Sequence, residues 1–119
     1  MSFDISIIII NYKSWKHLEN CLDSINKIDS MDFSFEVLVV DNCSSDIFFE
    51  VFKKKFTQYN FIENTGNNGF ANACNLGAKN AKGNFFLFLN PDTIISKEPL
   101  LKMYTFLNEN KNVGIVSCN

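Results

Sequence analysis

The chain has 119 residues and a formal net charge of −2, and 46% of its residues are hydrophobic while 20% are charged. This length is enough for one domain with a real hydrophobic core. The sequence has no lysine-rich or arginine-rich face, which argues against nucleic acid as the main partner.

Cysteine usage and the lack of long apolar runs bear on the compartment. The four cysteines form no C-x-x-C pair, so a zinc site or a disulfide framework is a weak interpretation. They are Cys21, Cys43, Cys74 and Cys118. No stretch approaches the length of a membrane-spanning helix, and the first residues do not resemble a signal peptide. We therefore expect reduced thiols in a cytoplasmic protein, or one at the cytoplasmic face of the membrane in its full-length form.

The first predicted pair of elements is a strand followed by a helix. Four consecutive isoleucines within Ser6–Ile10 predict a buried strand that ends at Asn11 and Tyr12. Apolar residues at helical spacing then predict an amphipathic helix over about 15–28.

The second pair repeats this order. Glu36–Val40 predicts a buried strand that ends at Asp41 and Asn42. Ser44–Asp46 supplies candidate N-cap residues for the next helix. The residues that we expect on its inner face are Phe48, Val51, Phe52 and Phe56.

The third pair contains an unusual asparagine-rich and glycine-rich segment. A short strand over Asn60–Glu63 leads into a turn that begins at Asn64 and becomes a helix ending near Ala81. One stripe of this helix is apolar and mostly small, which lets a helix lie close to a sheet. Its members are Phe70, Ala73, Cys74, Gly77, Ala78 and Ala81. A polar stripe of the same period contains Asn68, Asn72, Asn75 and Lys79.

The last predicted elements are a strand, a helix and a further strand. Asn84–Leu89 predicts a fully buried strand, because its last five residues are all apolar. Asn90, Pro91 and Asp92 end it, since proline cannot continue a central strand. A helix that opens at Ser96 and a fifth strand over Val113–Val116 follow.

Strands that are apolar on both faces and separated by helices define the fold class. They predict an α/β domain with a mostly parallel, doubly wound sheet and helices on both faces. Parallel strands bring their carboxyl ends to one edge, where ligands bind in such folds. The polar clusters after the first, second and fourth strands should meet there, beside a backbone turn that favours phosphate groups. The edge therefore predicts a nucleotide-diphosphate site with Mg²⁺ or Mn²⁺.

Familiar nucleotide and hydrolase motifs do not fit this site. The chain has no G-x-G-x-x-G after its first strand, no P-loop and no G-x-S-x-G elbow. Its single histidine, His17, lies within the first predicted helix, where a surface position is the better interpretation.

Four motifs in this order closely resemble family 2 glycosyltransferases of the GT-A fold, the nucleotide-diphospho-sugar transferase type, and especially rhamnosyltransferase-like members. The motifs are Ile7–Tyr12, Val39–Asn42 with Ser44–Asp46, Asn67–Ala71 with Asn75–Gly77, and Leu89–Thr93. The resemblance covers residues 1–119, but only the N-terminal, nucleotide-sugar-binding half of such an enzyme. It implies a truncated domain without the acceptor half.

The resemblance implies roles for residues around the nucleoside. Asp41 would hydrogen-bond the base, and Asn11 and Tyr12 would line the pocket of the base and ribose. The residues that would shape the wall near the nucleotide are Asn67, Gly69 and Asn75.

The segment Asn90–Asp92 resembles the DXD motif of this family. Asp92 would be the metal ligand to the diphosphate. Asn90 replaces the first carboxylate; its amide can hydrogen-bond a ribose but adds no charge. Metal affinity would therefore depend on the diphosphate itself.

Simpler interpretations of these residues stay open. Asp41 and Asp46 could cap the second helix, and Asn72 and Asn75 could be a solvated helix face. Tyr12 could be core packing.

The resemblance implies an inverting, metal-dependent transfer of a sugar from a nucleotide-diphosphate sugar to a glycan or lipid-linked acceptor. The general base would lie beyond Asn119, so the fragment alone should be inactive. A non-catalytic nucleotide-binding module and a nucleotidyltransferase are the alternatives. In the GT-A fold that this chain resembles, a later strand inserts between the fourth and fifth strands, so we expect this chain, with an unpaired apolar edge at Phe85–Leu89, to self-associate.

Overall fold

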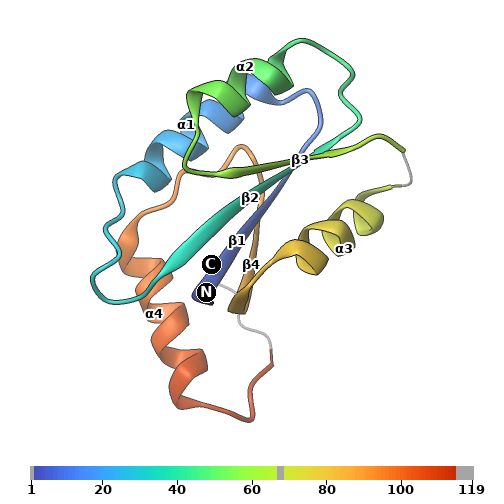
Figure 1. Cartoon of the computed structure of the whole chain (residues 1–119). Coiled ribbons are helices and arrows are strands. Elements are labelled where there is room, and N and C mark those ends of the chain that lie inside the picture. The colour runs from blue at the N-terminus through green and yellow to red at the C-terminus, as the bar shows by residue number, and fades with distance from the viewer. Residues whose placement is uncertain (1, 67–68, 115–119) are drawn as a thin grey trace.

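Strands and helices alternate along residues 2–66 and 69–114, the part of the chain that the computed structural model describes (Figure 1). The strands are β1 (Phe3–Asn11), β2 (Phe35–Asn42), β3 (Asn60–Asn64) and β4 (Gly83–Leu89). The helices are α1 (Trp15–Asn26), α2 (Phe48–Lys55), α3 (Phe70–Asn80) and α4 (Lys97–Glu109). Each predicted strand and helix up to Glu109 is present. No helix of the described residues is long and apolar enough to cross a membrane.

The strands form a parallel sheet in the order β3–β2–β1–β4. The chain starts in the middle of the sheet, winds outward through β2 to β3, and then crosses back to β4 (Figure 1). This is the doubly wound α/β architecture that the sequence predicts, and the prediction is confirmed.

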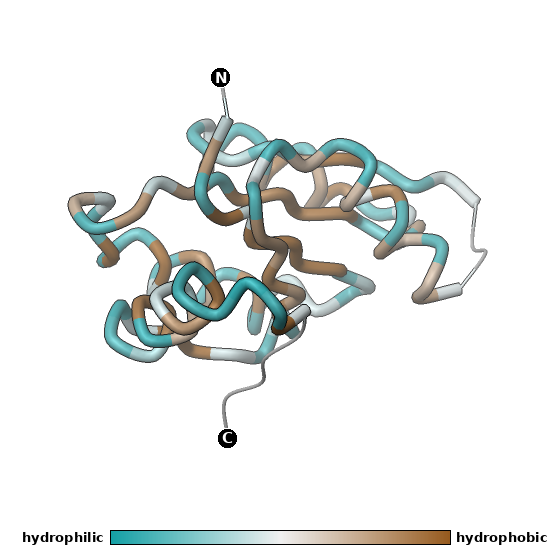
Figure 2. The backbone as a smooth tube through the Cα atoms, turned by 90° about the horizontal axis from the view of Figure 1, so that it is seen from below, coloured by the Kyte–Doolittle hydropathy of each residue, from teal (hydrophilic) through white to brown (hydrophobic). Residues whose placement is uncertain are grey.

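Successive side chains of β1 point to opposite faces of the sheet and create two cores. Ile7 and Ile9 pack with residues of α1, α2 and α4 on one face. Ile8 and Ile10 pack against α3 on the other face. Figure 2 shows the apolar strands in the middle of the molecule. Helices on both faces are therefore confirmed, and we name the two sides the α1 face and the α3 face.

Helix α3 lies unusually close to the sheet. A Cβ atom added at Gly77 would meet Cγ2 of Ile8 at 2.6 Å and Cγ2 of Val40 at 3.3 Å. The small stripe predicted for this helix therefore has the expected role. Phe70 departs from the prediction, because its side chain is 62% exposed at the start of the helix.

The buried face of α2 differs from the prediction. Phe49 and Phe52 are buried, whereas Phe48 and Val51 are about half exposed. The Trp15 ring packs on Phe52 with centroids 4.9 Å apart. Phe49 packs edge-to-face on Phe61 of β3, with centroids 6.2 Å apart, and this contact places Phe49, rather than Phe48, in the core.

The sequence predicts that β4 is fully buried, and this prediction is wrong. Among the described residues, β4 is an edge strand of the sheet. Phe86 and Phe88 are 45% and 48% exposed on the α3 face. The reason is that the core under α3 is built on β1 and β2. Of the predicted fifth strand, Val113 donates its N–H to the carbonyl of Asn110 in a turn. The rest of that strand, 115–116, lies outside the described residues.

Candidate functional site

The carboxyl ends of the strands bring the polar clusters together, as expected for parallel strands. Asn11 is the register partner of Asp41, and Asn42 is the partner of Asn64. Strand β4 ends beside β1, since Leu89 pairs with Ile9. The candidate site therefore lies at this edge of the sheet.

Alternation along the strands divides the polar clusters between the two faces. Asn11 and Asp41 have the same parity as the residues of the α1 face. Asn42 and Asn64 share parity with Ile10 and Val40, which pack under α3. Adjacent residues of β2 thus serve different sides of the sheet.

The Asp41 carboxylate is buried, because only 1% of the residue is exposed. Among the described residues, it accepts hydrogen bonds from Asn11 and Ser44. Its Oδ1 accepts the Asn11 amide at 3.1 Å and the Ser44 hydroxyl at 2.6 Å. Its Oδ2 accepts the Ser44 N–H at 3.2 Å. Both oxygens of Asp41 are therefore engaged beneath the site.

This network joins the loops that follow β1 and β2. The Lys13 N–H donates to the Ser44 hydroxyl at 2.9 Å. Lys13, Cys43 and Ser45 all have left-handed backbone conformations, with φ of 53°, 63° and 55°. Such conformations cost free energy for residues other than glycine and persist where surrounding contacts hold them. The Asp41 network supplies those contacts.

Asp46 links the same two loops to the helices that follow them. Its Oδ1 accepts the N–H of Phe48, the first residue of α2, at 3.1 Å. Its Oδ2 accepts the indole N–H of Trp15 at 2.9 Å. Asp46 therefore stabilises the start of α2, although the N-cap position itself is Ile47, which makes no side-chain cap hydrogen bond.

A pocket of about 440 Å³ with a mixed polar and apolar lining opens at this edge on the α3 face. Its lining residues are Ile10, Tyr12, Ser14, Asn42, Gly69, Phe70 and Pro91. Tyr12 and Gly69 were assigned to the site from the sequence. Gly69 precedes α3 with φ of 93°, a conformation that glycine adopts readily.

Asn42 and Phe70 line the pocket but were not assigned roles from the sequence. Asn42 is 8% exposed at the pocket floor, while the Phe70 ring is largely open. Asn42 lines the pocket and Asp41 does not, because side chains alternate along β2 and that of Asn42 points to the α3 face. Four consecutive buried isoleucines hide the alternation, because both faces of β1 look alike in the sequence.

The turn after β4 provides the remaining predicted residues. Asn90 and Asp92 are both exposed, and the Asn90 carbonyl accepts the Thr93 N–H at 3.1 Å. The turn continues to Ile95, whose N–H donates to the Ser24 hydroxyl of α1 at 3.1 Å. Burial raises the pKa of the Cys21 thiol to about 11, and the negative charge of Asp92 adds to the rise. The Asp92 carboxylate is therefore near α1.

One predicted wall residue is not brought into the pocket. Asn75 is exposed on α3 and is not among the described lining residues. Asn67 lies outside the described residues.

The donor set for a metal is small. The described residues contain no cluster of three or more acidic, histidine or cysteine side chains that could hold a metal ion. Asp92 offers one exposed carboxylate. This fits Mg²⁺ or Mn²⁺ bound mainly through ligand phosphates and water, and does not fit a metal held by the protein alone.

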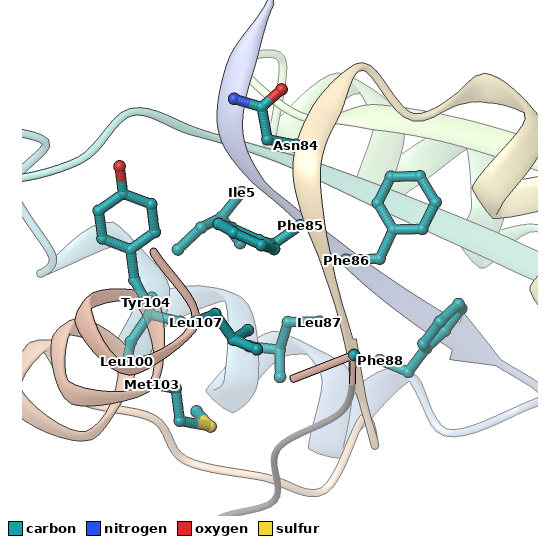
Figure 3. Close-up of a pocket in the computed structure, with 11 residues that line it drawn as sticks. Ile5, Asn84, Phe85, Phe86, Leu87, Phe88, Leu100, Met103, Tyr104 and Leu107 are labelled. Atoms are coloured by element: carbon teal, nitrogen blue, oxygen red, sulfur yellow. The ribbon is translucent and has the colours of Figure 1, made fainter. Parts of the chain in front are cut away.

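A larger cavity of about 510 Å³ lies between β4 and α4 (Figure 3). In Figure 3, Phe85 and Leu87 point toward α4, whereas Phe86 and Phe88 lie on the other side of β4. The lining of this larger cavity is mostly apolar, with few groups that could orient a polar ligand. The smaller pocket, whose lining is proportionally more polar, is therefore the better candidate site.

A parallel α/β sheet with a pocket at its carboxyl edge belongs to the nucleotide-binding class of folds. Residues 6–118 match the family model "Glycosyl transferase family 2". The chain belongs to this family.

Several relatives have known names. The chain is 34% identical over 107 residues to the poly(ribitol-phosphate) beta-N-acetylglucosaminyltransferase TarS of Staphylococcus aureus, covering 87% of this chain and 19% of TarS. It is 36% identical over 112 residues to the poly(ribitol-phosphate) beta-glucosyltransferase of Bacillus spizizenii, covering 91% and 18%. The chain thus spans about a fifth of the length of these curated relatives.

Solved structures show the same fold. The structure of S. aureus TarS 1–349 in complex with UDP matches with a TM-score of 0.73 at 30% identity, over 89% of this chain and 32% of that one. A mannosyltransferase from Pyrobaculum calidifontis, in complex with GDP-Man and Mn²⁺, matches with a TM-score of 0.75 at 22% identity, over 90% and 33%. These matches confirm the GT-A type of sheet.

Proposed function

We propose that this chain is the nucleotide-sugar-binding half of a glycosyltransferase that transfers a sugar from a nucleotide-diphosphate sugar to a glycan or lipid-linked acceptor. The pocket at the carboxyl edge of the sheet, beside the Asp92 turn, is the observation that carries this proposal. Membership of the family supports it, as does the UDP complex of TarS.

The pocket suits a nucleoside. Tyr12 is 51% exposed and Phe70 is 62% exposed, so both present aromatic surface on which a base can stack. Asn42 supplies an amide at the pocket floor. Asn11 and Asp41 contribute from beneath, because they hold the loop after β1, which carries Tyr12 and Ser14.

The turn after β4 suits the ribose and diphosphate. Asn90 would hydrogen-bond the ribose, and Asp92 would hold Mg²⁺ or Mn²⁺ together with the diphosphate. A bound metal would neutralise charge on the departing diphosphate. Asn67 and Asn75 remain proposed wall residues.

The acceptor half and the general base belong, in this proposal, to sequence beyond this chain. The matched segment is only about a fifth of each of these curated relatives, which supports this division. In an inverting reaction, a base there would take the proton from an acceptor hydroxyl as its oxygen attacks the anomeric carbon. We therefore expect this chain to bind donor without transferring sugar. The names of two relatives support a polyol-phosphate glycan as acceptor.

Calorimetric titration tests donor binding. We expect UDP, dTDP or GDP to bind weakly, and more tightly with Mn²⁺ or Mg²⁺ than without it. Asp92→Asn should abolish most of the gain from metal, since it removes the carboxylate of the turn. Asp23→Asn, at an exposed position on α1, is the matched control.

Two results would count against the proposal. If no nucleotide diphosphate binds, the function is wrong. If binding depends on metal equally in the Asp92→Asn variant, Asp92 does not belong to the metal site.

A further inference from the structure

The segment that carries Asp92 contains a turn but no helix or strand. Residues 90–96 connect β4 to α4, and Pro91 in the turn lines the pocket at the carboxyl edge. Within the segment, the Thr93 N–H donates to the Asn90 carbonyl at 3.1 Å and closes the turn. This bond shapes the turn but does not place it relative to the pocket. Contacts with the rest of the chain must do so.

Ser24 of α1 makes such a contact with its buried hydroxyl. Its Oγ accepts the Ile95 N–H at 3.1 Å. Its O–H donates to the Cys21 carbonyl, one turn earlier in α1, at 2.6 Å. Both partners are backbone groups, so the direction of each hydrogen bond is fixed. Since only 8% of Ser24 is exposed, water does not readily replace either bond.

Among the described residues, this is the only side-chain hydrogen bond between residues 90–95 and another part of the chain. Asp92 lies three residues before Ile95, which corresponds to at most about 10 Å of chain. The negative charge of Asp92 also contributes to the raised pKa of the Cys21 thiol, so the carboxylate lies near the same part of α1. The Ser24 bond therefore limits where the turn can stand.

The next anchor along the chain is weaker. The Lys97 ammonium pairs with Asp29 at 2.6 Å and with Asp32 at 2.7 Å. Both carboxylates are about half exposed, and exposed ion pairs contribute little to holding a segment in place. The buried Ser24 hydroxyl is therefore the stronger candidate for fixing the turn.

We propose that Ser24 is a positioning residue that holds the turn after β4 so that the Asp92 carboxylate faces a divalent metal ion on the diphosphate of the donor. This inference rests on the proposed function, because it assumes that Asp92 takes part in metal-assisted binding. Small divalent cations demand regular geometry from their oxygen ligands, so one displaced carboxylate weakens their binding. Ser24 acts through Asp92 and does not touch the ligand.

Ser6 on β1 provides a matched control. It is a fully buried serine whose Oγ accepts the Gly83 N–H at 2.8 Å and whose O–H donates to Oε2 of Glu36 at 2.6 Å. Ser6→Ala therefore removes the same two functions as Ser24→Ala. Gly83 begins β4, so the whole strand separates this bond from the turn. A loss of stability alone should affect nucleotide binding alike in both variants.

Calorimetric titration with and without Mn²⁺ tests the role of Ser24. The ligand is whichever of UDP, dTDP and GDP binds, and the measured quantity is the factor by which Mn²⁺ tightens its binding. We expect Ser24→Ala to lower this factor about fivefold, while the metal-free Kd changes by less than about twofold. Ser6→Ala should keep the wild-type factor, and urea unfolding of both variants shows whether their losses of stability are comparable.

Two further variants change the same hydroxyl. Ser24→Thr keeps the oxygen that accepts the Ile95 N–H and should retain the wild-type metal factor. Ser24→Cys offers only a weak acceptor of similar size, so it should lower the factor as Ser24→Ala does. It also replaces the alanine variant if that protein does not fold.

The outcomes separate this inference from the proposed function. An unchanged metal factor in Ser24→Ala and Ser24→Cys would overturn the role of Ser24 while leaving donor binding intact. An equal loss of the factor in Ser6→Ala would do the same, because it would reflect stability alone. Failure of all three nucleotides to bind the wild-type chain would overturn the proposed function, and this inference with it.

Discussion

The sheet differs on the two sides of β1: its polar and apolar groups find partners within the chain on the β2 side more fully than on the β4 side. Toward β2, the polar end of the sheet is closed by the Asp41 network, in which each carboxylate oxygen has partners within the chain. Toward β4, the sheet ends in a strand with two half-exposed phenylalanines and an apolar cavity beneath it. The comparison teaches that one side is a self-sufficient scaffold for the pocket, whereas the other side is a surface that favours a covering partner.

Breaking the closed side should have the largest effect. We expect Asp41→Ala to lower the free energy of unfolding by about 3 kcal/mol, because it leaves the buried Asn11 amide and Ser44 groups without their acceptor. Urea unfolding measures this loss. Asp23→Ala, at an exposed position on α1, should change stability by less than about 0.5 kcal/mol. A loss below about 1 kcal/mol in Asp41→Ala would show that the network does not maintain the loops.

A pH titration sharpens the same comparison inside the closed core. The Cys21 pKa rises from 9.0 to about 11 in the folded chain, mainly through burial. The unfolded thiol ionises first, so the contribution to stability is complete below pH 9 and is lost between pH 9 and 11. We expect a loss of about 1.4 kcal/mol by pH 10, measured by urea unfolding. Cys21→Ala should lack this portion of the pH dependence, and an identical slope in both proteins would contradict the assignment.

Substitutions on the β4 side should change the free energy of unfolding least, but they should clearly change the mass of the particles in solution. We propose that this chain self-associates through β4. Replacing Phe86 and Phe88 with serine should reduce association in light scattering across a concentration series. The cost in unfolding free energy should stay below about 1 kcal/mol, because both rings are half exposed.

A matched variant controls for lost apolar surface in general. Phe106→Ser removes a ring that is 45% exposed on α4 rather than on β4, and should leave association unchanged. A wild-type chain that stays monomeric at high concentration would remove the proposed association.

The order of elements was predictable from the sequence because polar clusters mark each strand end. Asn11, Asp41 and Asn90 each follow an apolar run, and parallel pairing brings these ends to one edge. The face of the sheet to which each of these side chains points was not predictable in the same way. A strand buried on both faces has no alternation, so the sequence alone could not tell whether Asp41 or Asn42 enters the pocket.

The position of β4 at the edge was hidden for a related reason. Phe85–Leu89 is apolar on both faces, which is typical of a central strand. The structure shows that α3 leaves the second face of β4 open, a tertiary fact that local pattern does not contain. The burial of Phe49 on α2 likewise depends on a tertiary contact, with Phe61 of β3.

Gly77 has a consequence for the pocket that its own neighbours do not suggest. It lies eight residues along the chain from Gly69, about 12 Å at the rise of a helix. Because a helix is stiff over that length, the spacing between Gly77 and Ile8 also sets how far Gly69 and Phe70 stand above the sheet. Gly77 thus sets the distance between α3 and the sheet at the end of the helix that lies away from the pocket. A single methyl group there would alter the aperture of the nucleotide pocket without touching its occupant.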